Sequence, residues 1–165
     1  MKENSLITYK IIGYIRTPFL ENKEVPIQSC FSSIEGWIEL FPEYIKGLTD
    51  LEGFSHLILL YHFHKAGQEQ LKVIPFLDEE TRGIFSTRAP VRPNPIGISI
   101  VELLSIELSR NILKIRGVDM FDSTPLLDIK PYIPLFDQRN AQTGWITSSL
   151  YQKKEKRVSD DRFST

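Results

Sequence analysis

The sequence predicts a mainly β domain, a barrel or a sandwich, with short helices and long loops. Apolar runs of strand length recur along the chain, helical periodicity is scarce, and the 165 residues include ten prolines and nine glycines. A chain of this size folds as one domain that buries about 70% of the surface its unfolded form exposes. We therefore expect a single β domain over residues 1–150.

The amino-terminal third predicts a strand, a loop and a second strand. Residues 9–16 (YKIIGYIR) are rich in Ile and Tyr and stop before Thr17-Pro18, as a strand does. Residues 19–33 show no clear period and predict a long loop. Residues 36–40 (GWIEL) alternate and predict a short strand.

The next two segments differ in kind. Residues 42–48 (PEYIKGL) place a proline at a first helical position and a glycine near the end, which suits one or two helical turns. Residues 56–63 (HLILLYHF) form a bulky apolar run that predicts a central strand.

The second half predicts a hairpin and one further strand. Residues 98–107 and 112–118 flank a short polar turn, and alternation in the second run leaves one face mostly wet. Residues 126–133 predict a strand interrupted by Pro131. Residues 151–165 contain the basic stretch KKEKR and predict a disordered tail.

Composition narrows the class of protein. No run reaches the roughly 18 apolar residues of a membrane helix, and the amino terminus lacks the apolar region of a signal peptide, so we expect a cytosolic protein without membrane contact. The single cysteine, Cys30, permits no internal disulfide. A net charge of −1 does not indicate a protein that binds nucleic acid through a globally basic surface, although a local patch is compatible with it.

Residues 85–97 (FSTRAPVRPNPIG) predict a rigid loop. Each proline fixes its own φ and forces the residue before it into an extended conformation, and three prolines exclude an interior strand. Arg88 and Arg92 offer preorganised forks for a carboxylate or a phosphate. The residues alone leave two interpretations open, a ligand clamp and a rigid structural turn.

Two other groups of residues carry possible chemistry. The run from Asp122 to Pro125 favours a turn that presents side-chain oxygens, either as an ordinary turn or to hold ribose hydroxyls or an adenine edge. Three histidines share one expected strand and would form a metal site if they faced one side, or would hydrogen-bond within the sheet: His56, His62 and His64. Signatures of P-loop, Rossmann and G-x-S-x-G proteins are absent from the sequence.

Five motifs occur in order and together resemble a known family: IGYIRTPF, VPIQ, LEGFSHLILLYHFH, RGIFSTRAPVRPNPIG and GVDMFDSTPLLDIKPYIP. They resemble the TsaA-like, or TrmO-type, family of S-adenosylmethionine-dependent tRNA methyltransferases over residues 11–137. The resemblance implies a β-barrel, a homodimer, and methyl transfer to the exocyclic amino nitrogen of threonylcarbamoyladenosine beside the tRNA anticodon.

The resemblance also implies residue roles. The cofactor contacts fall on Pro26, Ile27, Gln28, His64, Lys65, Arg88, Ile98, Asp122, Ser123, Thr124 and Pro125. Ile27 departs from the family pattern, which usually has arginine at that position. Bacterial members carry a further carboxy-terminal domain, whereas the printed chain stops soon after the expected barrel.

Two residues are expected at the chemical step and two at the RNA. We expect Asp122 to accept the proton of the attacking nitrogen and Asn94 to orient the base. Arg92 and Lys130 are expected to contact tRNA. The alternatives are a barrel that binds S-adenosylmethionine with another acceptor or without catalysis, and a histidine-metal hydrolase.

Overall fold

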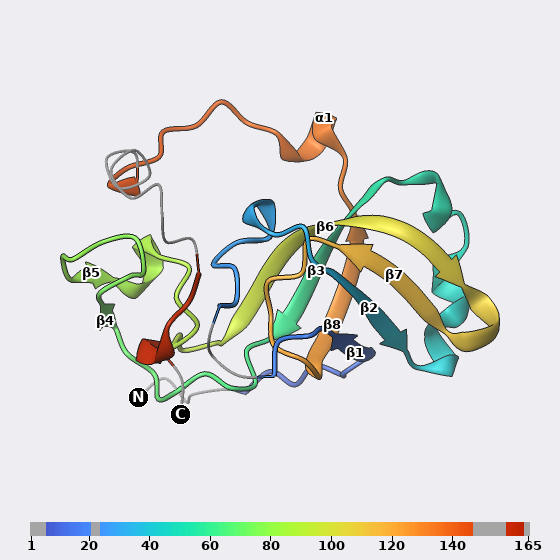
Figure 1. Ribbon diagram of the computed structural model, residues 1–165, viewed down its shortest axis with the longest axis horizontal. Coiled ribbons are helices and arrows are strands. Elements are labelled where there is room, and N and C mark those ends of the chain that lie inside the picture. Colours follow the sequence, from blue (N-terminus) through green and yellow to red (C-terminus); the bar gives the residue numbers. More distant parts are fainter. Residues whose placement is uncertain (1–5, 21–23, 147–157, 164–165) are drawn as a thin grey trace.

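The structure, a computed structural model, describes residues 6–20, 24–146 and 158–163. Six strands close into an antiparallel barrel in the order β1-β2-β7-β6-β3-β8, and β4 and β5 form a separate small sheet (Figure 1). The strands are β1 Gly13–Arg16, β2 Glu35–Leu40, β3 His56–His62, β4 Lys72–Val73, β5 Arg82–Gly83, β6 Ile96–Glu107, β7 Ile112–Arg116 and β8 Thr124–Pro131. The prediction of a mainly β fold is confirmed, and of the two predicted architectures the structure is the barrel.

The helices of the described residues are all short. Helix α1 spans Pro134–Asp137, and 3₁₀ helices span Ser29–Phe31, Pro42–Leu48, Leu51–Gly53, Ile84–Ser86, Leu108–Arg110 and Asp161–Phe163. The helical turns predicted over residues 42–48 are confirmed. None of these helices has the length and apolar character that crossing a bilayer requires.

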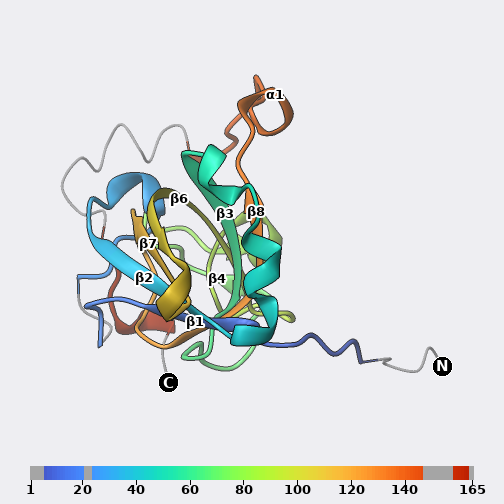
Figure 2. The ribbon, with the colours of Figure 1, turned by 90° about the vertical axis from the view of Figure 1, so that its right-hand side faces the viewer.

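Alternating side chains fill the barrel interior, around which the six strands are arranged in Figure 2. On β7, Leu113 and Ile115 are fully buried, whereas Lys114 between them is exposed. This confirms the mostly wet second face predicted from the sequence. Strand β3 pairs with β6 on one side and β8 on the other, so the predicted central strand is confirmed.

Near its start, strand β6 places small residues inside the barrel and large apolar residues outside, which is the reverse of the usual arrangement. Its small residues, such as Gly97 and Ser99, face inward, whereas Ile96, Ile98 and Ile100 are 41%, 50% and 42% exposed. The cause is the ring of Tyr61 on β3, because a Cβ on Gly97 would lie 2.2 Å from Tyr61 Cε2. The ring takes the space that an inward isoleucine would need, and the isoleucines form an apolar row outside.

The chain between β3 and β6 packs a second, smaller core. Val73, Ile84, Ala89 and Val91 are buried there together with Phe163, which comes from the carboxy-terminal segment. Figure 1 shows this segment, coloured red, beside the green excursion that carries β4 and β5. The second core therefore joins the middle of the sequence to its end.

Several predicted strand boundaries need correction. Strand β1 begins at Gly13, not at residue 9, because its ladders with β2 and β8 reach only to Gly13. Strand β6 starts two residues early, at Ile96, and β8 ends at Pro131, so that this proline terminates the strand without interrupting it. The hairpin turn before β7 closes at Asn111, which adopts a left-handed φ of 59°.

The tail predicted over residues 151–165 also differs from the structure in part. Residues 158–163 are packed: Val158 forms a β-bridge with Pro26, and Phe163 is 7% exposed in the second core. The remaining residues of the predicted tail, including KKEKR, lie outside the described residues. The prediction failed at residues 158–163 because composition does not reveal that an aromatic side chain at the end of a polar stretch has a distant core to enter.

Candidate functional site

A cavity of about 290 Å³ opens at one end of the barrel. Its walls come from segments far apart in sequence: the loop before the 3₁₀ helix Ser29–Phe31, the chain after β3, the proline loop, the start of β6, the turn before β8 and residues 158–163. Nine of the predicted residues line it: Pro26, Ile27, Gln28, His64, Lys65, Arg88, Arg92, Ile98 and Thr124. The fold thus brings most of the predicted cofactor residues into one site.

Other predicted residues lie elsewhere in the structure. Among the described residues that line the cavity, Asp122, Ser123 and Pro125 are missing, although Thr124 of the same turn is present. Asn94 is exposed in the proline loop, and Lys130 lies on the outer face of β8 in an ion pair with Asp128 (2.7 Å). These residues flank the site or lie away from it.

The proline loop is fixed from inside the protein. Val91 and Ala89 are buried in the second core, and the backbone amide of Phe63 donates to the carbonyl of Pro95 at 2.8 Å. Arg92 Nη1 donates to the carbonyl oxygens of Ile84 (3.2 Å) and Thr87 (2.9 Å). The Arg92 guanidinium thus stabilises the loop through its own hydrogen bonds. The predicted contact of Arg92 with tRNA stays a prediction.

Arg88 of the same loop points the other way. Its side chain is exposed, and Nη1 donates to Gln28 Oε1 at 2.5 Å across the cavity mouth. The contact joins the proline loop to the VPIQ loop. A guanidinium with most of its donors free of backbone partners is suited to binding a carboxylate. The structural interpretation of the loop therefore describes Arg92, whereas the ligand-clamp interpretation stays a prediction for Arg88.

A partly buried acid, Asp119, lies at the wall of the cavity, and it was not among the residues predicted to contact the cofactor or to take part in the chemical step. Ser99 Oγ donates to Asp119 Oδ1 at 2.5 Å, and the Tyr61 hydroxyl lies 2.9 Å from Ser99 Oγ. Burial raises the pKa of Asp119 to about 6, although hydrogen bonds from Ser99 and the Ser29 amide and the charge of Arg88 partly offset it. Burial also raises the pKa of Tyr61.

Asp122 has a structural environment. Its carboxylate accepts the Thr17 amide (3.1 Å) and the Ser123 hydroxyl (2.7 Å), and Arg16 Nη1 lies 3.6 Å from Oδ2. Burial would raise its pKa, but these hydrogen bonds and the Arg16 charge outweigh burial and hold the pKa below its ordinary value. Asp122 therefore ties β1 to the turn before β8, and its role as a base stays a prediction.

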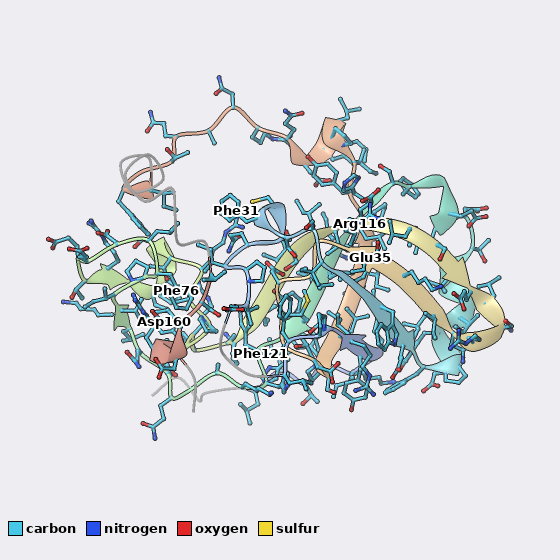
Figure 3. All side chains as sticks on the ribbon, in the orientation of Figure 1. Phe31, Glu35, Phe76, Arg116, Phe121 and Asp160 are labelled. Carbon is cyan, nitrogen blue, oxygen red and sulfur yellow. The ribbon has the colours of Figure 1, made fainter. Side chains whose placement is uncertain are left out.

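His64 and Lys65 border the cavity where β3 ends. The His64 amide bonds to the carbonyl of His62 (2.9 Å), a tight turn that directs the His64 ring toward Thr124 Oγ1, 3.4 Å away. Burial, followed by the charge of Lys65, lowers the pKa of His64. Lys65 Nζ donates to the Leu20 carbonyl (2.8 Å) and lies 5.1 Å from the centroid of the Phe121 ring, which Figure 3 labels.

The three histidines do not converge. His56 and His62 lie at opposite ends of β3, roughly 20 Å apart at the rise of a strand, and His64 has left the strand. Within the part of the chain that the structure describes, no group of three or more His, Cys, Asp or Glu side chains is arranged to hold a metal ion. The geometry therefore gives the metal-hydrolase alternative no support.

The fold and the site together define a class of protein, a closed six-stranded antiparallel barrel with a loop-lined cavity at one end. Comparison with known proteins gives its family. The chain belongs to the family of the tRNA-methyltransferase O N-terminal domain, whose model matches residues 14–138. The recognition made from the five motifs is thereby confirmed.

Individual relatives extend the match beyond those residues. The chain is 54% identical over 160 residues to a probable S-adenosyl-L-methionine-binding protein of Pyrococcus abyssi, covering 96% of this chain and 85% of that one. It is 39% identical over 139 residues to the tRNA (adenine(37)-N6)-methyltransferase of Escherichia coli, covering 79% and 59%. The crystal structure of TrmO from Pseudomonas aeruginosa aligns with a TM-score of 0.71 at 36% identity, covering 86% and 63%. The chain thus spans less than two thirds of the two bacterial proteins.

Proposed function

We propose that the cavity binds S-adenosylmethionine and that the protein transfers its methyl group to the exocyclic amino nitrogen of (threonylcarbamoyl)adenosine next to the tRNA anticodon. The observation that carries the proposal is the convergence of nine predicted residues on one cavity, with the exposed Arg88 and a partly buried acid, Asp119, both in its lining. The family and the name of the Escherichia coli relative support the reaction class.

The residues present fit this cofactor. The cavity volume is at the lower end of the roughly 300–1,000 Å³ of small-molecule sites. Arg88 would take the carboxylate of the methionine part, while the apolar walls around Phe63, Phe121 and Ile98 suit its adenine and thioether parts. Asp119 adds a negative group that complements a sulfonium.

When bound, the cofactor would supply a methyl group on a positively charged sulfur. The protein must then hold the acceptor nitrogen about 3 to 3.5 Å from that carbon and accept a proton from it. Of the neighbouring carboxylates Asp119 and Asp122, Asp119 is the one that lines the cavity, and its pKa of about 6 suits proton acceptance near neutral pH. We assign the role of proton acceptor to Asp119 ahead of Asp122.

The proposed partners are tRNA and a second copy of the chain. Lys130 stays a proposed tRNA contact, and Arg92 a weaker one. For the homodimer, the apolar row of Ile96, Ile98 and Ile100 offers a face that two copies would cover by pairing it with itself. Ile58 and Ile100 pair in register on β3 and β6, so the row continues onto the neighbouring strand.

A second candidate function is cofactor binding without this methyl transfer. The relative from Pyrococcus abyssi, which matches almost the whole chain, is named only for binding S-adenosylmethionine. Under this alternative the same cavity would bind the cofactor, and the acceptor would be different or absent. Activity measurements therefore separate the two functions, whereas binding measurements do not.

The test begins with binding. S-adenosylmethionine at a hundredfold excess over its Kd should stabilise the protein by about 2.7 kcal/mol, seen as a rise in Tm. Arg88→Ala should weaken binding about 10- to 100-fold, because it removes charge-assisted hydrogen bonds worth about 1.5–3 kcal/mol. Arg110→Ala, at the exposed β6–β7 turn, is the matched control and should bind like the wild type.

Transfer of labelled methyl groups to tRNA then divides the two functions. Incorporation into adenosine beside the anticodon, reduced in Arg88→Ala, is expected for the proposed function. Binding without incorporation would favour the cofactor-binding alternative. No change in Tm at saturating cofactor would contradict both.

A further inference from the structure

The segment of residues 158–163 is held to the loop that carries the VPIQ motif. Val158 forms an antiparallel β-bridge with Pro26, and the Ser159 amide donates to the carbonyl of Val25 at 2.7 Å. Backbone hydrogen bonds of this kind fix the direction of the segment along the loop. The end of the chain therefore runs beside residues that border the cavity.

The other end of the segment is held to the excursion between β3 and β6. Phe163 is buried in the second core, with its ring centroid 5.0 Å from that of Phe76, and its carbonyl accepts the Gly67 amide at 3.0 Å. The Arg162 guanidinium donates hydrogen bonds to both oxygens of the Asp160 carboxylate, from Nε to Oδ1 at 2.8 Å and from Nη2 to Oδ2 at 2.7 Å. These contacts hold the segment across the space between two loops.

Arg162 adds a further connection. Its Nη1 donates to the carbonyl oxygens of Ile74 (3.3 Å) and Pro75 (3.1 Å), and its guanidinium carbon lies 5.1 Å from the centroid of the Phe76 ring. One side chain thus fixes the segment to the backbone of the excursion. Removing it would loosen the segment without removing the buried Phe163.

The cavity lies on the inner side of this segment. Ser159, Asp160 and Phe163 line it together with Arg88. Figure 3 labels three lining residues from different parts of the chain, Asp160, Phe76 and Phe121. The segment is outside the range 14–138 that the family model matches, so the family motifs do not describe this wall.

We propose that residues 158–163 form the closing wall of the cofactor cavity, so that the barrel and the carboxy-terminal segment together make the S-adenosylmethionine site. The inference rests on the proposed function for the identity of the ligand. The segment is joined to the VPIQ loop at one end and to the second core at the other, and it therefore keeps the two loops at the separation the ligand requires. Without it the loops must be ordered at the moment of binding, which weakens affinity.

The test compares wild type, a chain ending at residue 157, Arg162→Ala and the control Phe136→Ala. Phe136 is 61% exposed on α1 and does not belong to the residues that line the cavity. Isothermal titration with S-adenosylmethionine should show Kd raised about tenfold or more for the shortened chain and less for Arg162→Ala. A tenfold rise is expected if, without residues 158–163, the two loops hold the binding arrangement only about a tenth of the time. Phe136→Ala should bind like the wild type.

A second measurement keeps the proposal testable if the shortened chain does not fold, which far-ultraviolet circular dichroism would reveal. Amide hydrogen exchange in the wild type should slow at residues 158–163 and at Gly67 when S-adenosylmethionine binds. Unchanged exchange there, or equal affinity of the wild type and a folded shortened chain, would overturn this inference and leave the proposed function standing. Failure of the wild type to bind would instead overturn the proposed function.

Discussion

Two carboxylates three residues apart have opposite environments. Asp119 is partly buried beside Ser99, and burial raises its pKa to about 6, whereas the Thr17 amide and Arg16 help to hold the pKa of Asp122 below its ordinary value. A carboxyl group with a raised pKa is able to take up a proton near neutral pH, and one with a lowered pKa is not. Asp119 is therefore suited to accepting a proton, whereas Asp122 stabilises the turn before β8.

The pKa of Asp119 predicts a pH dependence of stability. In the folded protein Asp119 binds its proton up to about pH 6, while in the unfolded chain it has lost the proton by about pH 4, so folding favours the protonated form. As pH rises from about 4 to 7, the wild type should lose up to about 3 kcal/mol of unfolding free energy relative to Asp119→Asn. Urea unfolding of both proteins across this range measures the difference.

Asp122→Asn provides the control of opposite sign. Its carboxylate is stabilised in the folded state, so the wild type should gain stability over this variant as pH rises through the acid range, and lose it as pH falls. Parallel pH profiles for the wild type and Asp119→Asn would show that Asp119 titrates normally. That result would remove the support that its pKa gives to the proposed role as proton acceptor.

Strand β6 connects the barrel to the cavity. Gly97 lies under the Tyr61 ring, Ser99 links Tyr61 to Asp119, and the outward Ile98 borders the cavity. The position of the tyrosine ring thus decides both the packing of the strand and the orientation of the acid. A small change at Gly97 should reach the site through this ring.

Gly97→Ala should destabilise the protein by about 1–3 kcal/mol and weaken cofactor binding, because the new methyl group would overlap the Tyr61 ring. Gly53→Ala is the matched control, since a Cβ there meets nothing within 4 Å. Its stability should stay within about 1 kcal/mol of the wild type, with a gain favoured. Thermal unfolding and cofactor titration of both variants check the prediction, and equal behaviour of the two would refute it.

At the scale of the whole molecule, the outer apolar row borders the cavity. Ile96 and Ile98 are exposed and also line the cavity, and Ile100 follows them along β6. A second copy seated on this row would lie next to the cofactor. Dimer formation and the completeness of the site are therefore connected in the proposed function.

Ile100→Glu should shift the protein from dimer to monomer, because it places a charge within the apolar row. Leu108→Glu is the control, because Leu108 is 58% exposed at the far hairpin turn. Light scattering after size-exclusion chromatography measures both masses. A wild type that is monomeric at high concentration would contradict the dimer, and a dimeric Ile100→Glu would contradict this face.

Much of the architecture follows from local patterns, which is why the sequence predicts it. The hairpin from β6 to β7, the central position of β3 and the helical turns at residues 42–48 rest on alternation and on turn residues. The rigidity of the proline loop likewise comes from fixed φ angles. Strand ends were missed because they depend on where the partner strands stop.

The features of the site likewise divide into those that follow from local sequence and those that depend on distant residues. By itself, the sequence determined the mainly β composition, the rigid loop and the five motifs whose resemblance names the cofactor residues, since each depends on residue type and spacing. Only the tertiary structure decided that Arg88 contacts Gln28 while Arg92 binds backbone carbonyls, that Asp119 is the acid beside the cavity, and that Phe163 lines that cavity. Burial and long-range packing set these outcomes, because a side chain's environment depends on residues that the chain order leaves far apart.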